Sequence, residues 1–226
     1  MSATAARFRD SLEVLRKREP FRFPADAIPA GFGRAAVLIA FWPEAGDVRC
    51  VLTRRATTLS THQGQVAFPG GRVDPGEGWQ QAALREAHEE VGLDPSVVEV
   101  IGNLDDAWSG AGHHIVPVVG WLNEPAPLRP NPGEVDEILL PRLSEMLRPE
   151  ALRQQAVVHD GRTYHNRIVS FDGGEVYGLS TDLLLEALAW GTGERPARGP
   201  ERLSELRSYH PDSLARSRDT ANRDRA

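Results

Sequence analysis

Apolar residues recur along this chain at regular spacings that predict its main helices. Phe8, Leu12 and Leu15 lie at helical spacing among charged residues, which predicts an amphipathic N-terminal helix. Residues 79–91 consist of strong helix formers, and the Gly92 that follows suits the left-handed position after a last helical turn. A third apolar stripe at helical spacing, over residues 181–190, predicts a late helix that Ser180 or Thr181 can cap.

Short apolar runs bounded by turn residues predict the strands. Two β-branched runs, residues 34–42 and 48–54, predict a hairpin with one buried face. Further strands are expected at residues 97–104, 114–122, 134–140, 155–159 and 163–171. The last two flank Asp160-Gly161, a strong hairpin signal. Residues 56–78 show neither period and predict a long, functional loop. The order of strands and helices predicts an α+β fold.

A chain of 226 residues is expected to form one main domain. The pattern divides it into an N-terminal helix and connector (residues 1–30), a main domain (31–191) and a mostly disordered tail with one short helix (192–226). The tail is assigned because it is rich in Arg, Gly, Pro and Ser and has few residues to bury. The exposed apolar face expected for the N-terminal helix favours a homodimer.

Composition narrows the classes of function. The net charge of −6 argues against a broad nucleic-acid interface, which needs a basic face. Cys50 is the single cysteine, so no internal disulfide and no cysteine-based zinc cluster can form. No signal-like segment and no run of eighteen apolar residues occurs. We therefore expect a cytoplasmic protein that binds neither membrane nor nucleic acid.

The helix over residues 79–91 carries an acidic face. At about 100° per residue, Glu86, Glu89 and Glu90 share one side, whereas Ala87 and Val91 point to the other. No Lys or Arg occurs from residue 86 to residue 100 to relieve the repulsion between these carboxylates. Hard oxygen ligands at this density suit Mg²⁺ or Mn²⁺. The alternative is a solvated acidic helix surface.

The residues around this face occur at fixed spacings. Gly71 is followed by Glu77 and then by Arg85-Glu86-Ala87-His88-Glu89-Glu90-Val91-Gly92-Leu93. Seven fixed positions match by chance about once in 10⁸ starting points. The pattern resembles the Nudix box, although Ala87 stands where a larger aliphatic residue is preferred. This resemblance implies a mixed β-sheet sandwiched between helices (α/β/α) and metal-dependent hydrolysis of a nucleoside diphosphate linked to another group.

The same resemblance implies the metal site. Glu86 and Glu90 correspond to the principal metal ligands, with Glu89 as a third ligand or as the group that activates water. The carbonyl of Gly71 is expected to complete the shell. Gly70, like Gly71, lets the backbone approach metal and phosphate without a side chain between them.

Two further roles follow from this chemistry. Arg85 is expected to orient Glu77 or a metal-binding glutamate through a bidentate pair. A base must take the proton of the attacking water, and both Glu89 and Glu134 are candidates, because related enzymes often place a glutamate at the start of the later strand.

The segment before the box points to a substrate. Residues 52–71, which end in Phe68-Pro69-Gly70-Gly71, resemble the signature of coenzyme A diphosphatases. Ser60 stands where that signature has its second arginine, and Arg54 or Arg55 could compensate by binding the anionic substrate. The resemblance implies a small-molecule substrate, CoA or its thioesters, cleaved to 3′-phospho-AMP and 4′-phosphopantetheine. The alternatives are a diphosphatase for ADP-ribose or another nucleoside diphosphate derivative, and a non-catalytic ligand-binding domain.

Overall fold

The protein is described by a computed structural model that covers the backbone of residues 1–57, 63–159 and 162–207. The side chains of residues 157–165 are not part of this description. Within the covered ranges, no helix is long and apolar enough to cross a membrane. Ser60 and the Asp160-Gly161 turn, which the sequence singles out, lie outside the described residues.

Helices occur at both ends of the described chain and between its strands. The α-helices are α1 (Ala3–Leu12), α2 (Trp79–Val91), α3 (Leu143–Met146), α4 (Leu179–Thr192) and α5 (Gly199–Arg207), and the short 3₁₀ helices are η1 (Glu13–Arg16), η2 (Ala25–Ala27) and η3 (Pro95–Val97). The bounds predicted for α2 are confirmed, and Gly92 ends the helix at a φ of 68°. The cap predicted for α4 is wrong, because Gly178 precedes the helix and Thr181 is buried inside it.

The strands form three sheets. They are β1 (Gly33–Glu44), β2 (Asp47–Cys50), β3 (Leu52–Arg55), β4 (Val66–Ala67), β5 (Gly70–Arg72), β6 (Glu99–Asn103), β7 (Ala107–Ser109), β8 (His113–Trp121), β9 (Val135–Leu139), β10 (Leu152–His159), β11 (Arg162–Phe171) and β12 (Gly174–Tyr177). The largest sheet has the order β2-β1-β8-β6, with β5 beside β1 and β7 beside β8. The smaller sheets have the orders β4-β3-β9 and β10-β11-β12.

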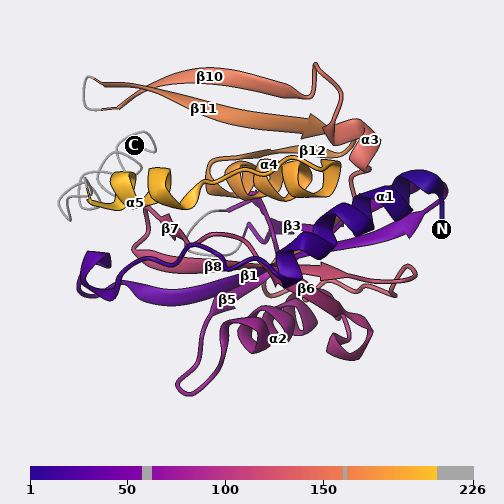
Figure 1. The fold of residues 1–226 in the computed structure, drawn as a ribbon, viewed down its shortest axis with the longest axis horizontal. Helices are drawn as coiled ribbons and strands as arrows, with labels where there is room; N and C mark the ends of the chain where they lie inside the picture. Colours follow the sequence, from indigo (N-terminus) through magenta and orange to yellow (C-terminus); the bar gives the residue numbers. More distant parts are fainter. Residues whose placement is uncertain (58–62, 160–161, 208–226) are drawn as a thin grey trace.

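The largest sheet is mixed and lies between helices. β1 runs parallel to β8, and its pairs with β2 and β5 are antiparallel. Figure 1 shows α2 on one side of this sheet and α1 and α4 on the other. Leu38 packs in a core with the α2 side chains, and Ile39 and Phe41 pack in the core that includes α1 and α4. The predicted α+β class and the α/β/α sandwich are therefore confirmed.

Two predicted elements differ from those observed. The first hairpin was expected to bury one face, but helices cover both faces of β1. Residues 52–55 leave that hairpin and form β3 of a second sheet. The expected loop of residues 56–78 also contains β4 and β5. By contrast, the later hairpin is confirmed, because β10 and β11 pair from Leu152↔Val169 to His159↔Arg162.

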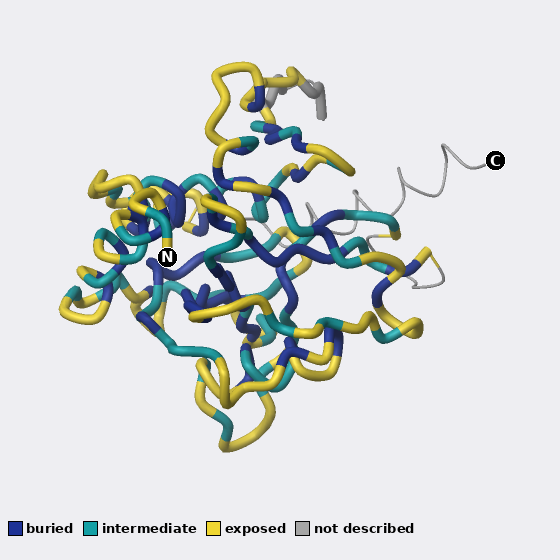
Figure 2. The backbone as a smooth tube through the Cα atoms, turned by 90° about the vertical axis from the view of Figure 1, so that its right-hand side faces the viewer, coloured by how far each residue is buried: buried dark blue, intermediate teal, exposed yellow. Residues whose placement is uncertain are grey.

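Both ends of the described chain pack on the body of the protein. The apolar face of α1 is buried, and the ring of Phe8 meets that of Phe41 edge-on at 5.1 Å. This burial removes the exposed face on which the homodimer was predicted. At the other end, α5 lies where one short helix was expected in the tail, and it buries Arg202 and Leu206. Figure 2 shows the buried segments at the centre and the exposed ones in peripheral turns.

Candidate active site

The three glutamates on the acidic face of α2 differ in burial. Ala83, Ala87 and other small residues of the opposite face pack against the largest sheet. The side chain of Glu89 is 51% exposed and that of Glu86 is 15% exposed, whereas Glu90 as a whole is only 4% exposed. The acidic face therefore runs from solvent into the protein interior, which the helical projection did not predict.

The strand β5 brings two glycines against these carboxylates. The N–H of Gly70 donates a hydrogen bond to Glu90 Oε2 at 3.2 Å. A β-carbon on Gly71 would lie 2.4 Å from the carboxyl carbon of Glu86 and 2.5 Å from both of its oxygens. A β-carbon on Gly70 would lie 2.4 Å from the carbonyl oxygen of Ala36. The missing side chains therefore let the backbone and the carboxylates lie in direct contact.

Arg85 connects the acidic face to the loop before the helix. Its guanidinium donates two hydrogen bonds to Glu77, at 2.9 and 3.1 Å, and one to the carbonyl of Arg72 at 2.8 Å. Its Nη1 donates at 3.0 Å to both Glu86 and Glu89. The hydrogen bonds from Arg85 hold the pKa of Glu77 below its usual range. Arg85 thus contributes the orienting pairs expected of it, and relieves part of the repulsion assigned to metal alone.

The buried end of the acidic face is electrostatically strained. Burial is the largest cause that raises the pKa of Glu90, which reaches about 7. The negative charges of Glu86 and Glu134 raise this pKa further, whereas the hydrogen bond from the N–H of Gly70 and the charge of Arg55 lower it. Burial also raises the pKa of Glu86, against the pull of Arg85. The charge of Glu134, which belongs to a separate segment, thus acts on Glu86 and on Glu90.

This donor set suits a divalent cation. It consists of hard carboxylate and carbonyl oxygens whose mutual repulsion a bound cation would relieve. Within the described residues, however, no three His, Cys, Asp or Glu side chains already converge as metal ligands. Arg85 holds one oxygen each of Glu86 and Glu89.

The two adjacent arginines of β3 occupy different environments. Arg54 donates to Glu137 Oε2 at 3.0 Å and to the carbonyl of Gly173 at 2.8 Å. Arg55 acts on the charge of Glu90, and its buried Nε has no hydrogen-bond partner among the described residues. Neighbouring strand residues point to opposite faces, which explains the difference. Arg54 is thus engaged by Glu137 and Gly173, whereas the charge of Arg55 acts on Glu90. That either arginine binds substrate stays a prediction.

Sequence reasoning missed one contributor to this arrangement. Asn131 donates its backbone N–H to the carbonyl of Glu90 at 2.8 Å and precedes Glu134 in a tight turn. The Asn-Pro-Gly sequence of residues 131–133 is a turn signal that could have drawn attention to it.

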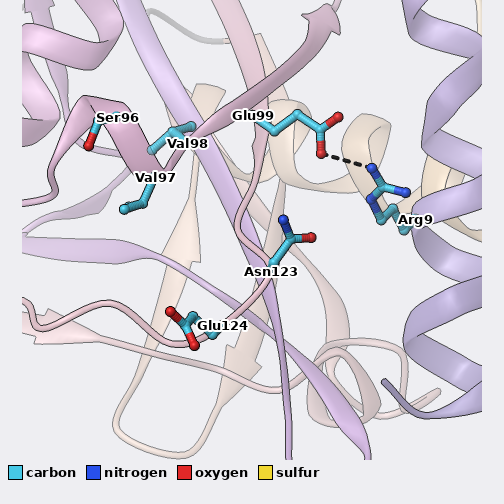
Figure 3. Close-up of a pocket in the computed structure, with 7 residues that line it drawn as sticks. All are labelled: Arg9, Ser96, Val97, Val98, Glu99, Asn123 and Glu124. Atoms are coloured by element: carbon cyan, nitrogen blue, oxygen red, sulfur yellow. Dashed lines mark hydrogen bonds and ion pairs between the residues drawn. The ribbon is translucent and has the colours of Figure 1, made fainter.

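A surface hollow of about 600 Å³ lies elsewhere in the molecule. Its lining includes Arg9, Glu99 and Asn123, and Figure 3 shows Arg9 and Glu99 paired across it. Arg9 donates to Glu99 at 2.8 Å. None of the α2 carboxylates lines this hollow, so it adds nothing to their chemistry.

Comparisons with known proteins bear on the same region. A family model described as the NUDIX domain matches residues 31–166. The chain is similar to "Nudix hydrolase 15, mitochondrial" of Arabidopsis thaliana, with 36% identity over 199 residues, 84% of this chain and 66% of that protein. It is also similar to an "Uncharacterized Nudix hydrolase NudL" of Yersinia pestis (strain Pestoides F), with 36% identity over 152 residues, 67% of this chain and 76% of that protein.

Solved structures share part of the chain. The crystal structure of a C. elegans Ap4A hydrolase binary complex is 24% identical, with a TM-score of 0.43, and the match covers 49% of this chain and 80% of that chain. The chain spans just under two thirds of the length of the Arabidopsis protein.

Proposed function

The chain belongs to the Nudix family, and from this premise we propose that it hydrolyses the diphosphate of coenzyme A or of its thioesters. The products would be 3′-phospho-AMP and 4′-phosphopantetheine, or an acyl-phosphopantetheine when the substrate is a thioester. One observation supports the hydrolysis most strongly: the carboxylate of Glu90 lies against the backbone of Gly70, and that of Glu86 lies against Gly71. The divalent cation that neutralises a diphosphate needs oxygen ligands of this kind.

The carboxylates of α2 are proposed to bind the metal ion. Glu86 and Glu90, with Glu89 and the carbonyl of Gly71, would hold Mg²⁺ or Mn²⁺, which neutralises phosphate oxygens and acidifies water when bound. Arg85 keeps Glu86 and Glu89 in place through its two bonds of 3.0 Å.

The reaction itself is a displacement at phosphorus. The water oxygen forms a new bond to one phosphorus, the bridging P–O bond breaks, and the proton of the water passes to a carboxylate. Arg55 would bind a phosphate oxygen of the substrate through its guanidinium. Gly70 lets β5 lie against β1, where a β-carbon would meet the carbonyl oxygen of Ala36 at 2.4 Å, and this keeps its N–H on Glu90 beside the expected phosphate site.

We assign the proton to Glu134 rather than to Glu89. Glu89 Oε2 already accepts a hydrogen bond from Arg85 at 3.0 Å, so one oxygen of this carboxylate is occupied by the guanidinium. Glu134 lies near enough to Glu86 and Glu90 to raise the pKa of both. Supporting evidence would be a fall in kcat for Glu134→Gln with unchanged metal affinity, whereas normal turnover would remove the assignment.

The choice of CoA rests on the sequence of residues 52–71. Their likeness to the coenzyme A diphosphatase signature supports a CoA-type substrate. Ser60, which replaces the second arginine of that signature, favours ADP-ribose or another nucleoside diphosphate derivative as the alternative. A non-catalytic domain is disfavoured, because Glu86, Glu89 and Glu90 are all present. The cytoplasmic location and the lack of nucleic-acid binding stay predictions.

A hydrolysis panel tests this proposal. CoA, acetyl-CoA, ADP-ribose, NADH and diadenosine polyphosphates would be compared with Mg²⁺ and with Mn²⁺, and Glu90→Gln would serve as the inactive control. We expect CoA or acetyl-CoA to give the highest kcat/KM and Glu90→Gln to lose turnover on every substrate. ADP-ribose cleavage far above CoA cleavage would overturn the substrate, and an inactive wild-type protein would overturn the hydrolase.

A further inference from the structure

The segment of residues 129–135 attaches itself to the end of α2. The N–H of Arg129 donates to the carbonyl of Val91, and the N–H of Asn131 donates to the carbonyl of Glu90, both at 2.8 Å. The last carbonyls of an α-helix have no partner within the helix. The segment therefore satisfies two of them, and one belongs to the most buried glutamate of the candidate site.

Asn131 also organises the turn that leads to Glu134. Its carbonyl accepts the N–H of Glu134 at 3.0 Å and that of Val135 at 2.8 Å. Its side-chain Oδ1 accepts the N–H of Gly133 at 3.1 Å. An Asn side chain that bonds to the N–H two residues later stabilises a chain reversal in place of a backbone contact. Asn131 thus joins this turn to Glu90 through both its backbone and its side chain.

The other side of Glu134 is held by the second sheet. The N–H of Ala56 donates to the carbonyl of Glu134 at 2.9 Å, and Arg55 pairs with Val135 in the β3–β9 ladder. Glu134 therefore lies between two fixed elements, α2 through Asn131 and β3 through Ala56. Its side chain is exposed, so the backbone around it sets where its carboxylate can reach.

We propose that Asn131 is a positioning residue, which holds Glu134 beside the α2 carboxylates so that Glu134 takes the proton from the attacking water. This inference rests on the proposed function. Asn131 acts through the turn and not through the substrate, so its loss lowers kcat and leaves KM nearly unchanged. A displacement of the base by a fraction of an ångström to an ångström is enough to slow proton transfer.

The test compares Asn131→Ala with Asn131→Asp, which keeps an Oδ1 acceptor for the turn. We expect Asn131→Ala to lower kcat roughly tenfold or more with a change in KM below about twofold, and Asn131→Asp to recover most of kcat. Asn123, an exposed asparagine on the remote hollow of Figure 3, provides the matched control, and Asn123→Ala should behave like the wild type.

A double mutant separates positioning from general damage. In protein that already carries Glu134→Gln, Asn131→Ala should lower kcat no further, because the group it positions is gone. If the two losses multiply instead, the inference is overturned. Circular dichroism and thermal unfolding would check each fold, and Asn131→Gln, which displaces the amide by one methylene, replaces Asn131→Ala if that variant does not fold.

The outcomes distinguish this inference from the function on which it rests. Wild-type protein without turnover contradicts the proposed hydrolase. Active wild type with a normal Glu134→Gln removes the base and the positioning role together. Active wild type with an impaired Glu134→Gln but a normal Asn131→Ala contradicts the positioning role alone.

Discussion

Gly71 lies so close to Glu86 that a β-carbon on the glycine would come within 2.4 Å of the carboxyl carbon. Real β-carbons do not approach other atoms at this distance, so any side chain at residue 71 must push the carboxylate away. Because Glu86 also accepts a hydrogen bond from Arg85 at 3.0 Å, its displacement would disturb that pair as well.

Gly71→Ala is therefore expected to lower kcat about 100-fold while the protein stays folded. The measurement is steady-state hydrolysis of the best substrate, with circular dichroism as the check of the fold. Gly110 offers a matched control, because a β-carbon there meets nothing within 4 Å and its φ is not in the left-handed range. Similar rates for both variants would show that the Gly71–Glu86 contact is unimportant for catalysis.

The two arginines of β3 should separate binding from structure. Arg55→Ala is expected to raise KM roughly tenfold or more, because the charge of Arg55 acts on Glu90 and its Nε has no partner among the described residues. Arg54→Ala should leave KM unchanged, since Arg54 bonds to Glu137 and to the carbonyl of Gly173. An increase in KM confined to Arg54→Ala would reverse this assignment.

The buried ion pair between α4 and α5 predicts a stability effect. Arg202 Nη2 lies 2.5 Å from Glu186 Oε2, and the side chains are 4% and 0% exposed. Arg202→Met leaves a carboxylate buried without its partner, which should cost about 3–5 kcal/mol of the free energy of unfolding. Urea unfolding measures this loss of free energy of unfolding. The exposed Arg153–Glu175 pair is the control, and its loss should cost at most about 1 kcal/mol.

The double variant Arg202→Met with Glu186→Leu completes this test. Removing both charges should recover most of the lost free energy of unfolding, because the penalty comes from the unpaired carboxylate. Equal losses for the single and double variants would mean that the packing of Arg202, and not its charge, secures α5.

Asp106 predicts a dependence of stability on acid. It is fully buried and accepts hydrogen bonds from His114 Nε2 at 2.7 Å and from the N–H of Phe23 at 2.8 Å. Burial alone would raise the pKa of Asp106, but His114, Phe23 and the charge of Arg22 together hold that pKa below its ordinary value.

A carboxyl group whose pKa is lower in the folded state stabilises the fold at pH values above its pKa in the unfolded chain, about 3.9. This stabilisation disappears as the pH falls through the lower pKa of the folded state. The difference in free energy of unfolding between wild type and Asp106→Asn should therefore be largest near neutral pH and shrink below about pH 4. Urea unfolding over this range measures it. A difference that does not vary with pH would contradict the ionised state of Asp106.

Local patterns predicted the helices better than the sheets. α2 was placed correctly, because strong helix formers and Gly92 act within a few residues of one another. β1 was assigned one buried face, because its parallel partner β8 and the helices on both faces come from distant parts of the chain. β4 and β5 were missed, since strands of two and three residues are too short to show a period.

The candidate site shows the same division. The residue spacing within α2 correctly predicted that Glu86, Glu89 and Glu90 share one face. It did not predict the burial of Glu90, which depends on β5 and on the segment after residue 125. α5 packs through Arg202, which is buried in an ion pair with Glu186 of α4. The low apolar content of the tail gives no sign of this pair. The alternation of strand residues separates Arg54 from Arg55, but the partner of Arg54, Glu137, comes from the distant strand β9.

Mn²⁺ binding tests most directly whether the α2 carboxylates form the metal site of a Nudix hydrolase. The concentration of free Mn²⁺ would be followed by electron paramagnetic resonance in titrations of the wild type, Glu86→Gln and Glu124→Gln, the last being an exposed glutamate on the remote hollow. We predict saturable binding to the wild type and to Glu124→Gln, and binding weakened by roughly tenfold or more in Glu86→Gln. Equal affinity in all three proteins would contradict the account.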